Sequence, residues 1–320
     1  MCYCLRRILL AACSGRSVLG GGPVKFVVAK LFIVSAFAVM AQSAMAQKSI
    51  CGRSDDRVPS KVPQVGRALR SLSDNGGCSM TMIGPTCAIS AGHCAAYLNI
   101  AEFNTPPSVR GRIQHPKAKD IYYADRSTLE YQDAGIGRDW AVYQLLPNEQ
   151  TGELPGIAQG HWQVELQDTD LEVGTLLTIV GYGHDTEPTR KFAQQTNSGP
   201  VYSVGGSALR HNADTKGGNS GSSVVRARDG KIVGIHTHGG CRSTGGANSS
   251  TFIAGHERLK QAILDCLAKE PTVHDKITDV VPLVALKVGA KTKQAGIACV
   301  RKVSGTPYCL VYSAVEGLCE

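Results

Sequence analysis

The feature that most constrains the fold of this chain is a series of short apolar runs separated by turn-forming residues. Each run is four to eight residues long, and Gly, Pro, Asn or Asp lie between them; the runs are residues 78–83, 87–90, 140–146, 176–182, 222–225 and 232–236. Runs of this length with regular turn signals are typical of strands in a β-sandwich or β-barrel. The 36 Gly and 14 Pro residues also favour a fold with many turns. The pattern predicts an all-β fold.

One segment departs from this pattern. Residues 257–268 place four apolar side chains at three- and four-residue spacing, which predicts a late helix with one apolar face: Leu259, Ile263, Cys266 and Leu267. The chain has 320 residues, of which 42% are hydrophobic. It is therefore long enough and apolar enough for two medium-sized domains with buried cores.

The first 46 residues have the composition of an export signal. They hold five Lys or Arg residues and no Asp or Glu, and the run 31–40 is apolar apart from one Ser. That run is shorter than the roughly 20 residues of a membrane-spanning helix. Residues 44–46, Ala-Met-Ala, fit the small-x-small rule for signal cleavage, so we expect a mature chain that starts at Gln47. We expect an exported protein, periplasmic or extracellular, without membrane attachment after the signal is removed.

The charge and the cysteines of the remaining chain narrow the possible functions. Without the first 46 residues there are 29 basic and 26 acidic residues. Nucleic-acid-binding proteins are usually far more basic, with clustered charge, so we expect no nucleic-acid partner. Nine cysteines remain, and in an exported chain that density indicates disulfides, with at least one thiol left free or paired with another chain. No C-x-x-C follows the leader, and we predict no metal and no other cofactor.

Three short motifs carry candidate chemistry. Residues 90–94 (Ser-Ala-Gly-His-Cys) end one apolar run, residues 139–142 (Asp-Trp-Ala-Val) open another, and residues 217–222 (Gly-Gly-Asn-Ser-Gly-Ser) form a Gly-rich loop. A Ser hydroxyl becomes a nucleophile when an imidazole takes its proton, and the imidazole needs a carboxylate to fix its tautomer. Glycines beside the Ser let backbone N–H groups face a developing oxyanion. The order His, Asp, Ser is one of three known orders of such triads.

With these motifs the chain resembles trypsin-like serine peptidases of the chymotrypsin fold over about residues 51–267. Within that family it is most similar to the bacterial glutamyl-endopeptidase-like branch, whose nucleophile motif is G-N-S-G-S rather than G-D-S-G-G. The spacings also fit the family, because Asp139 follows His93 by 46 residues and Ser220 follows Asp139 by 81. The resemblance implies a secreted serine endopeptidase whose partners are protein or peptide substrates.

The resemblance also implies a role for each residue of these motifs. His93 would act as general base and then as general acid, Asp139 would orient it, and Ser220 would be the acylating nucleophile. The backbone N–H groups of Gly218 and Ser220 would form the oxyanion hole. A disulfide between Cys78 and Cys94, which are 16 residues apart, would hold the loop of the catalytic His.

The fold of that family consists of two six-stranded antiparallel barrels with the active site between them. We therefore expect a signal peptide (1–46), an extended lead-in (47–70), a first barrel with His93 and Asp139 (71–160), a second barrel and closing helix with Ser220 (161–268), and a Cys-containing C-terminal extension (269–320). The extension fits either an accessory module or a disulfide-tied tail, and a Cys299–Cys309 bridge is geometrically easy there. The oligomeric state is left open.

Asn219 departs from the trypsin pattern. In that pattern an Asp at this place pairs with the new N-terminus that zymogen cleavage creates. We do not expect activation by that route here. Removal of the leader, with or without a short piece of the lead-in, is the simpler route.

Two features point to different residues before the cleaved bond. His236 ends an apolar run in a Gly-Ile-His sequence that resembles the glutamyl-specific motif, where a His binds the substrate carboxylate. Strand alternation places His238 on the same face, as a second pocket imidazole. Asp214 resembles the pocket Asp of enzymes that cut after Arg or Lys, and a carboxylate there would repel Glu. Thr215 could add a hydroxyl to either pocket. We favour acidic substrates and keep Arg or Lys as the alternative.

Two other interpretations use the same residues. A metal site could draw on three imidazoles and a thiol, but the surrounding glycines and a disulfide role for the Cys speak against it: His211, His236, His238 and Cys241. A binding protein on a protease-like scaffold is the alternative from another class. Such proteins usually lack a member of the triad, and this chain keeps all three.

Overall fold

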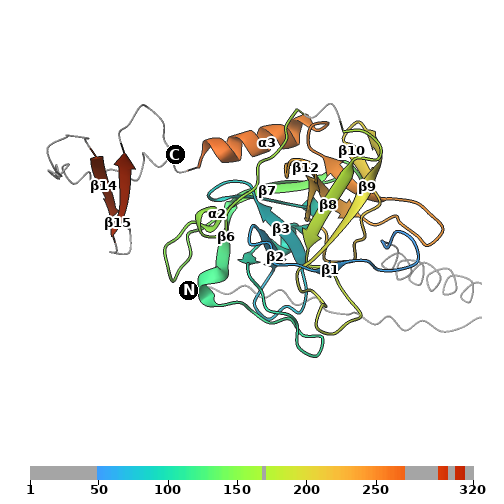
Figure 1. Cartoon of the computed structure of the whole chain (residues 1–320), viewed down its shortest axis with the longest axis horizontal. Coiled ribbons are helices and arrows are strands. Elements are labelled where there is room, and N and C mark those ends of the chain that lie inside the picture. The colour runs from blue at the N-terminus through green and yellow to red at the C-terminus, as the bar shows by residue number, and fades with distance from the viewer. Residues whose placement is uncertain (1–48, 168–170, 271–294, 302–306, 314–320) are drawn as a thin grey trace, which may run out of the picture. The chain divides into compact units, whose positions relative to one another are not determined.

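The computed structural model describes residues 49–167, 171–270, 295–301 and 307–313. The expected signal peptide at 1–46 lies outside the described residues, as does most of the C-terminal extension. From residue 49 to residue 270 the chain forms two β-barrels and one longer helix (Figure 1). Among the described residues, no helix is long and apolar enough to cross a membrane.

The first barrel is a closed ring of six antiparallel strands. Their order around the ring is β2, β3, β4, β7, β6, β5. The strands are β2 (Val65–Leu69), β3 (Cys78–Met82), β4 (Cys87–Ser90), β5 (Ile100–Glu102), β6 (Ile121–Asp133) and β7 (Asp139–Leu145). The interior is filled by a large apolar cluster in which Met80, Phe103, Tyr122 and Trp140 are fully buried.

The second barrel is also closed. Its six antiparallel strands pair in the ring order β8, β9, β10, β13, β12, β11, and β11 pairs with β8 again. They are β8 (Leu176–Gly181), β9 (Gln195–Gly205), β10 (Ala208–His211), β11 (Ser223–Arg226), β12 (Ile232–His238) and β13 (Asn248–Phe252). A short strand, β1 (Val58–Pro59), pairs with β9 on the outside of the ring. The predicted all-β fold of two six-stranded barrels is confirmed.

Each of the six apolar runs coincides with a strand, within one or two residues at the ends. The strands that the sequence did not predict carry polar side chains. β6 runs from Ile121 to Asp133, and most of its side chains are partly or fully exposed. β9 likewise has a polar, half-exposed sequence. A strand of this kind is held by its neighbours in the ring and not by its own apolar pattern.

The first barrel begins earlier than expected, because β2 lies inside the segment 47–70. Its apolar pattern is interrupted by Arg67, which is fully buried. The Arg67 guanidinium donates to the Glu102 carboxylate at 2.6 Å, and Glu102 is also fully buried. Burial of an Arg is favourable only with such a partner, and this pairing between strands hides β2 from a search for apolar runs. The extended lead-in is therefore shorter than predicted and ends before Val65.

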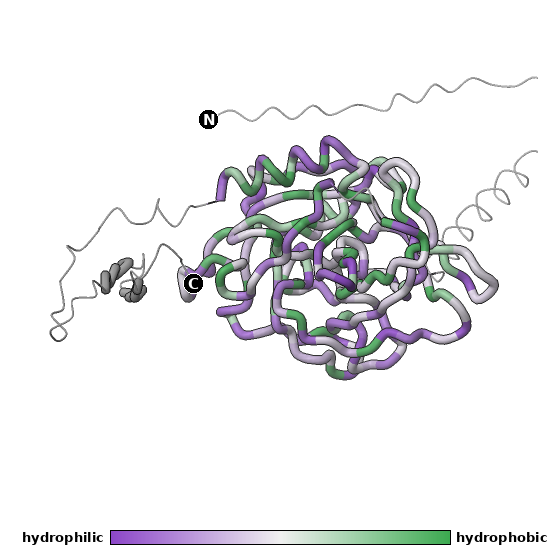
Figure 2. Tube along the Cα trace, turned by 45° about the horizontal axis from the view of Figure 1, so that its top comes forward, coloured by the Kyte–Doolittle hydropathy of each residue, from purple (hydrophilic) through white to green (hydrophobic). Residues whose placement is uncertain are grey.

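The helix α3 (Glu257–Ala268) has the predicted bounds. The His256 side chain accepts the Leu259 N–H as an N-cap. Leu259, Ile263 and Cys266 are buried in the first-barrel core, and Cys266 forms a disulfide with Cys87 of β4. Hydrophobic and hydrophilic residues alternate along this helix (Figure 2). The helix thus closes on the first barrel, although it was expected to belong with the second.

The remaining elements are short. The 3₁₀ helices η2 (Gly92–Tyr97) and η3 (Ala118–Asp120) and the single-turn helix α2 (Pro155–Ala158) connect strands of the barrels. In the C-terminal extension, β14 (Ala295–Arg301) and β15 (Pro307–Ser313) form an antiparallel hairpin in which Cys299 stands opposite Cys309.

Candidate active site

His93 and Asp139 are brought together by two neighbouring strands of the first barrel. Ser90 at the end of β4 pairs with Ala141 of β7, and His93 follows in η2 while Asp139 opens β7. The fully buried Asp139 carboxylate accepts two hydrogen bonds from His93, one from its backbone N–H at 3.0 Å and one at Nδ1 at 2.6 Å. Both oxygens are therefore used to fix the position of one imidazole.

Gly92 is needed for this approach. A Cβ at this position would lie 1.9 Å from the backbone oxygen of Gln132, so a larger residue would push η2 away from the barrel.

The acid–base properties of His93 follow from its partner. Burial alone would lower its pKa, but the hydrogen bond and the negative charge of Asp139 outweigh burial and raise the pKa above the usual 6.5. Such an imidazole is a stronger base, and its protonated form is stabilised by the carboxylate. The geometry thus suits a group that takes a proton and returns it.

The Gly-rich loop of residues 217–222 is clamped between the two barrels. Ser79 of β3 donates its backbone N–H to the Ser220 oxygen and its hydroxyl to the Gly218 oxygen, both at 2.8 Å. Gly218 has φ +101°, and a Cβ there would lie 2.4 Å from the Tyr182 oxygen. Only glycine allows this backbone conformation beside Ser220.

His93 and Ser220 line the same cleft, whose volume is about 900 Å³. The cleft runs between the barrels, with Gly77 and Cys78 on one wall and Gly217 and Gly218 on the other. A candidate nucleophile, a candidate base and the glycines of the expected oxyanion hole therefore face one space. This is the arrangement that acyl transfer requires.

Two disulfides near the active site leave their cysteines without a thiol that could bind a metal ion. Cys78 is bonded to Cys94, as the family resemblance implies, which joins β3 to η2 beside His93. Cys241 is bonded to Cys51. A disulfide sulfur has no thiolate to offer a metal ion. The side chains of Cys78, His93 and Cys94 lie close enough together to hold a metal ion, but the two sulfurs are close because they are bonded to each other.

His236 lies against a second buried imidazole. His236 is 3% exposed on β12, and its Nδ1 is 3.3 Å from Nε2 of the fully buried His211 on β10. Burial, and then the neighbouring His211, lower the pKa of His236 well below 6.5, and burial lowers that of His211 to about 4. Both rings are neutral at neutral pH, so an anion beside His236 would be the charge that favours its protonation. Sequence analysis grouped His211 with His236 only as a candidate metal ligand and did not predict this contact between two imidazoles, which lie 25 residues apart.

His238 lies toward the His93–Asp139 pair. The pairing of β12 with β13 shifts register between His236 and His238, and this bulge interrupts the strand alternation behind the prediction. Nδ1 of His238 lies 3.9 Å from the Asp139 carboxylate, and its ring centroid is 5.9 Å from that of His93. His238 therefore stands beside the His93–Asp139 pair.

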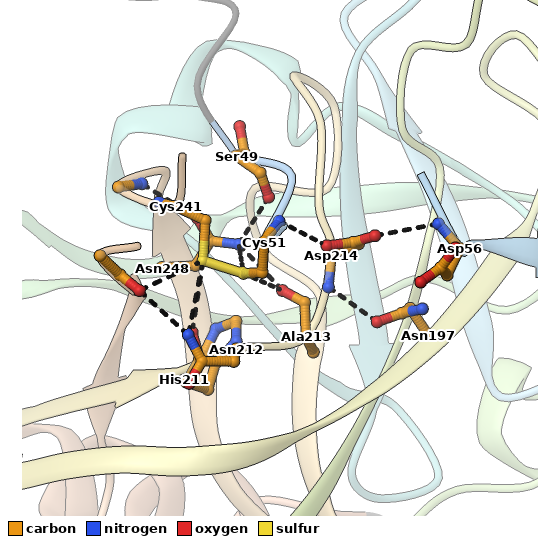
Figure 3. The surroundings of a disulfide bond; sticks show 12 residues. Ser49, Cys51, Asp56, Asn197, His211, Asn212, Ala213, Asp214, Cys241 and Asn248 are labelled. Atoms are coloured by element: carbon orange, nitrogen blue, oxygen red, sulfur yellow. Dashed lines mark hydrogen bonds between the residues drawn. A yellow bond between two sulfur atoms is a disulfide. The ribbon is translucent and has the colours of Figure 1, made fainter. Parts of the chain in front are cut away.

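Asp214 is engaged by the lead-in. Its carboxylate accepts the backbone N–H of Cys51 at 2.7 Å and that of Asp56 at 2.9 Å, next to the Cys51–Cys241 disulfide (Figure 3). Asp214 is 3% exposed, and burial raises its pKa. These contacts leave the carboxylate poorly placed to receive a substrate cation. No local sequence pattern predicts these hydrogen bonds, because Cys51 is 163 residues away from Asp214 in the sequence.

Thr215 is fully buried, and its backbone N–H donates to the Ser49 oxygen at 3.1 Å. Within the described part of the chain its hydroxyl has no hydrogen-bond partner.

Lys216 is the principal free cation of the cleft. No described carboxylate lies within ion-pair distance of it, whereas Arg70, on the same cleft, has Asp74 at 3.6 Å. Lys216 therefore adds a positive charge to the cleft that Ser220 also lines, and the Asp55 carboxylate interacts with it through charge.

Comparison with known proteins agrees with this geometry. Residues 81–235 match the model of the trypsin-like peptidase domain. Over 155 residues the chain is 26% identical to a glutamyl endopeptidase of Staphylococcus epidermidis, and the match covers 48% of this chain and 50% of that protein. The chain thus spans about half the length of the curated relatives it matches.

Two solved structures share the fold. A Glu endopeptidase in complex with MPD aligns with a TM-score of 0.52 and 20% identity, over 69% of this chain and 100% of that chain. A thermostable serine protease, AL20, from an extremophilic microorganism aligns with a TM-score of 0.50 and 13% identity, over 65% of this chain and 99% of the other. At these identities the likeness concerns the fold.

Proposed function

We propose that this chain, whose two barrels form a trypsin-like peptidase domain of the chymotrypsin fold, is an exported serine endopeptidase that cuts after acidic residues. The observation that carries the proposal is the double hydrogen bond from His93 to the buried Asp139 carboxylate, on the cleft that Ser220 also lines. An imidazole held in this way has one tautomer, with the proton on Nδ1 and a free lone pair on Nε2.

The reaction would proceed in two acyl-transfer steps. Oγ of Ser220 attacks the peptide carbonyl while Nε2 of His93 takes its proton, and the carbonyl oxygen becomes an oxyanion facing the N–H groups of Gly218 and Ser220. The C–N bond then breaks, and the imidazolium gives its proton to the leaving amine. A water molecule, deprotonated by His93, attacks the ester and releases the acid, and the proton returns to Ser220.

The preference for acidic residues rests on His236. With Nδ1 directed at His211, its Nε2 is left to bond with a substrate carboxylate. That carboxylate would supply the charge that makes protonation of His236 favourable. Lys216 adds positive potential at the cleft. A glutamyl endopeptidase is also among the curated relatives.

The alternative preference for Arg or Lys has less support. It requires the Asp214 carboxylate to face the substrate, but both of its oxygens accept N–H groups of the lead-in. A non-catalytic scaffold has no observation in its favour, because all three triad positions keep residues able to act.

Export is supported by the three disulfides of the described residues, since such bonds persist in oxidising compartments. Cleavage after residue 46 would leave Cys51 on the mature chain, where it bonds to Cys241. Removal of a longer piece that included Cys51 would break that bond.

A survey of cleavage sites tests the proposal. The leader-free protein and its Ser220→Ala variant are incubated with a denatured protein mixture, and the new termini are sequenced. We expect cuts after Glu that are absent with the variant. Cuts after Arg or Lys would transfer the specificity to Asp214, and cuts that are equal in both samples would remove the proposed nucleophile.

A further inference from the structure

Arg57, in the lead-in just before β1, is a buried cation that the proposed mechanism does not use. It is 2% exposed. Its Nε and Nη2 donate to the Asp55 carboxylate at 2.9 and 2.7 Å, and Nη2 lies 3.6 Å from Asp185. Nη2 also donates to the backbone oxygen of His184 at 2.9 Å. Arg is rarely buried to this extent, so the burial of Arg57 indicates a structural role beyond a surface ion pair.

The bond to His184 leads directly to the oxyanion hole. The His184 N–H donates to the Gly217 oxygen at 2.7 Å. The backbone of His184 thus accepts a hydrogen bond from Arg57 at its carbonyl and donates one to Gly217 at its amide. The Gly217 oxygen and the Gly218 N–H belong to one planar trans peptide unit and point in opposite directions. Fixing the oxygen toward His184 therefore turns the Gly218 N–H away from the His184 amide, on a residue that lines the cleft.

The guanidinium also lies close to the residue before the nucleophile. A Cβ on Gly183 would be 2.4 Å from Nη1 of Arg57 and 2.2 Å from Oδ1 of Asn219, so both side chains pack on this glycine. Nη1 is buried, and among the described residues it has no hydrogen-bond partner. The Asn219 oxygen in turn accepts the Lys216 N–H at 2.9 Å. Arg57 is thus packed behind the loop that carries Ser220.

We propose that Arg57 is a positioning residue that keeps the Gly217–Gly218 peptide in the orientation required for the oxyanion hole. This inference rests on the proposed peptidase function. Because Arg57 belongs to the lead-in, the active enzyme must keep that segment through residue 57. Cleavage beyond this point together with reduction of the Cys51–Cys241 bond, which otherwise tethers the severed piece, would leave the catalytic triad intact and the oxyanion hole without its support.

The test compares two cations of one cluster. Arg57→Met removes the guanidinium. Arg190→Met is the control for the rest of the cluster: Nε of Arg190 lies 3.1 Å from Asp185 and its Nη1 donates to the backbone oxygen of Arg57 at 3.2 Å, but no bond from Arg190 to His184 or to the Gly-rich loop is described. We expect kcat of Arg57→Met to fall about 10- to 100-fold with KM little changed, since loss of one oxyanion donor costs about 10²–10³-fold. Arg190→Met should stay within about threefold of the wild type.

A second variant covers the case in which Arg57→Met does not fold. Arg57→Lys keeps the charge beside Asp55, but a single ammonium lacks the planar fork that serves a carboxylate and a carbonyl together. Its kcat should be intermediate. Unchanged kcat in both Arg57 variants, or equal losses in the Arg57 and Arg190 variants, would overturn the proposal.

Hydrogen exchange separates this inference from the proposed function. The His184 amide, followed by NMR without any substrate, should exchange about tenfold faster in Arg57→Met and unchanged in Arg190→Met. Faster exchange in a protein that cleaves nothing would retain the role of Arg57 and reject the peptidase. Normal cleavage with unchanged exchange and unchanged kcat would reject Arg57 and retain the peptidase.

Discussion

The two barrels hold their halves of the active site in different ways. In the first barrel, the side-chain contacts of His93 come from Asp139 on a neighbouring strand and from a disulfide that closes 16 residues. In the second barrel, the loop of Ser220 is held by His236 of β12, whose backbone oxygen accepts the Gly221 N–H, and from outside by Ser79 of the first barrel. The region of Asp214 is held by the lead-in. The disulfide on that side, Cys51–Cys241, spans 190 residues.

This difference separates two kinds of dependence. The pairing of His93 with Asp139 is made within the first barrel, with Thr251 of β13 hydrogen-bonded to the Asp139 backbone, whereas the region of Asp214 depends on a segment near the N-terminus. A change in the lead-in should therefore alter substrate choice and oxyanion binding while the basicity of His93 stays as it was.

The largest expected effect lies in the half of the site that the first barrel carries. In Asp139→Asn, one oxygen can still accept the His93 N–H, but an NH₂ group then faces Nδ1 and favours the wrong imidazole tautomer. We expect kcat on a Glu-containing peptide to fall about 10⁴-fold. The matched control is Asp133→Asn, an exposed carboxylate that acts on His93 only through its charge. Comparable losses in both variants would mean that charge alone, and not the paired hydrogen bonds, matters.

The next effect tests the dependence on the lead-in. Replacing Cys51 and Cys241 by Ser should lower the free energy of unfolding by about 3 kcal/mol, measured by denaturant titration. The same variant should discriminate less well between Glu and Ala substrates, because Asp214 and Thr215 contact residues 49–56.

The contrasting variant replaces Cys78 and Cys94 by Ser. It should reduce kcat on all substrates alike, since this bridge lies beside His93. If the two pairs of substitutions gave the same pattern, the two halves of the site would not differ in the way described.

A smaller effect is expected from the pocket imidazole itself. His236→Gln removes the cation that would face a substrate carboxylate, and the ratio of kcat/KM for Glu over Ala should fall about 10- to 100-fold. Asp214→Asn should keep the preference for Glu, because the Asp214 carboxylate faces the lead-in. The assignment would fail if Asp214→Asn abolished a preference for Arg or Lys in the wild type.

The smallest effect concerns pH. Neutral His93 is the base, so kcat/KM on an uncharged substrate should fall as the pH drops through its pKa, which Asp139 raises above 6.5. The midpoint of this acid limb should lie above 6.5 and move slightly lower in Asp133→Asn, whose carboxylate also raises the pKa. It should stay unchanged in the Cys51 and Cys241 double variant. A midpoint below 6.5 in the wild type would contradict the account of His93.

Sequence patterns were sufficient where local residues decide the structure. The apolar runs predicted β4 and β7, which position His93 and Asp139, and the spacing of Leu259, Ile263 and Cys266 predicted α3. The order of the three motifs indicated His93 and Ser220, which line one cleft, and Asp139, which is buried behind His93. These features need only the periodicity of a strand or helix and the chemistry of each side chain.

Sequence patterns failed where a partner far away in the sequence determines the position or contacts of a side chain. Asp214 stands where a pocket carboxylate would be, and only the arrival of Cys51 and Asp56 shows that it holds the lead-in. The bulge between His236 and His238 depends on pairing with β13. In the sequence, Arg57 is one charged residue in a polar segment, and only the structure shows its hydrogen bond to His184. Non-local contacts of this kind leave no periodic signal in the sequence.

Labelling of Ser220 tests the central claim most directly. The leader-free protein is treated with a fluorophosphonate, and the intact mass and the modified peptide are determined beside Ser220→Ala and His93→Ala. The account predicts one adduct per chain, on Ser220, and none in either variant. Labelling at another residue, or labelling that persists in His93→Ala at the wild-type rate, would contradict a nucleophile activated by His93 and Asp139.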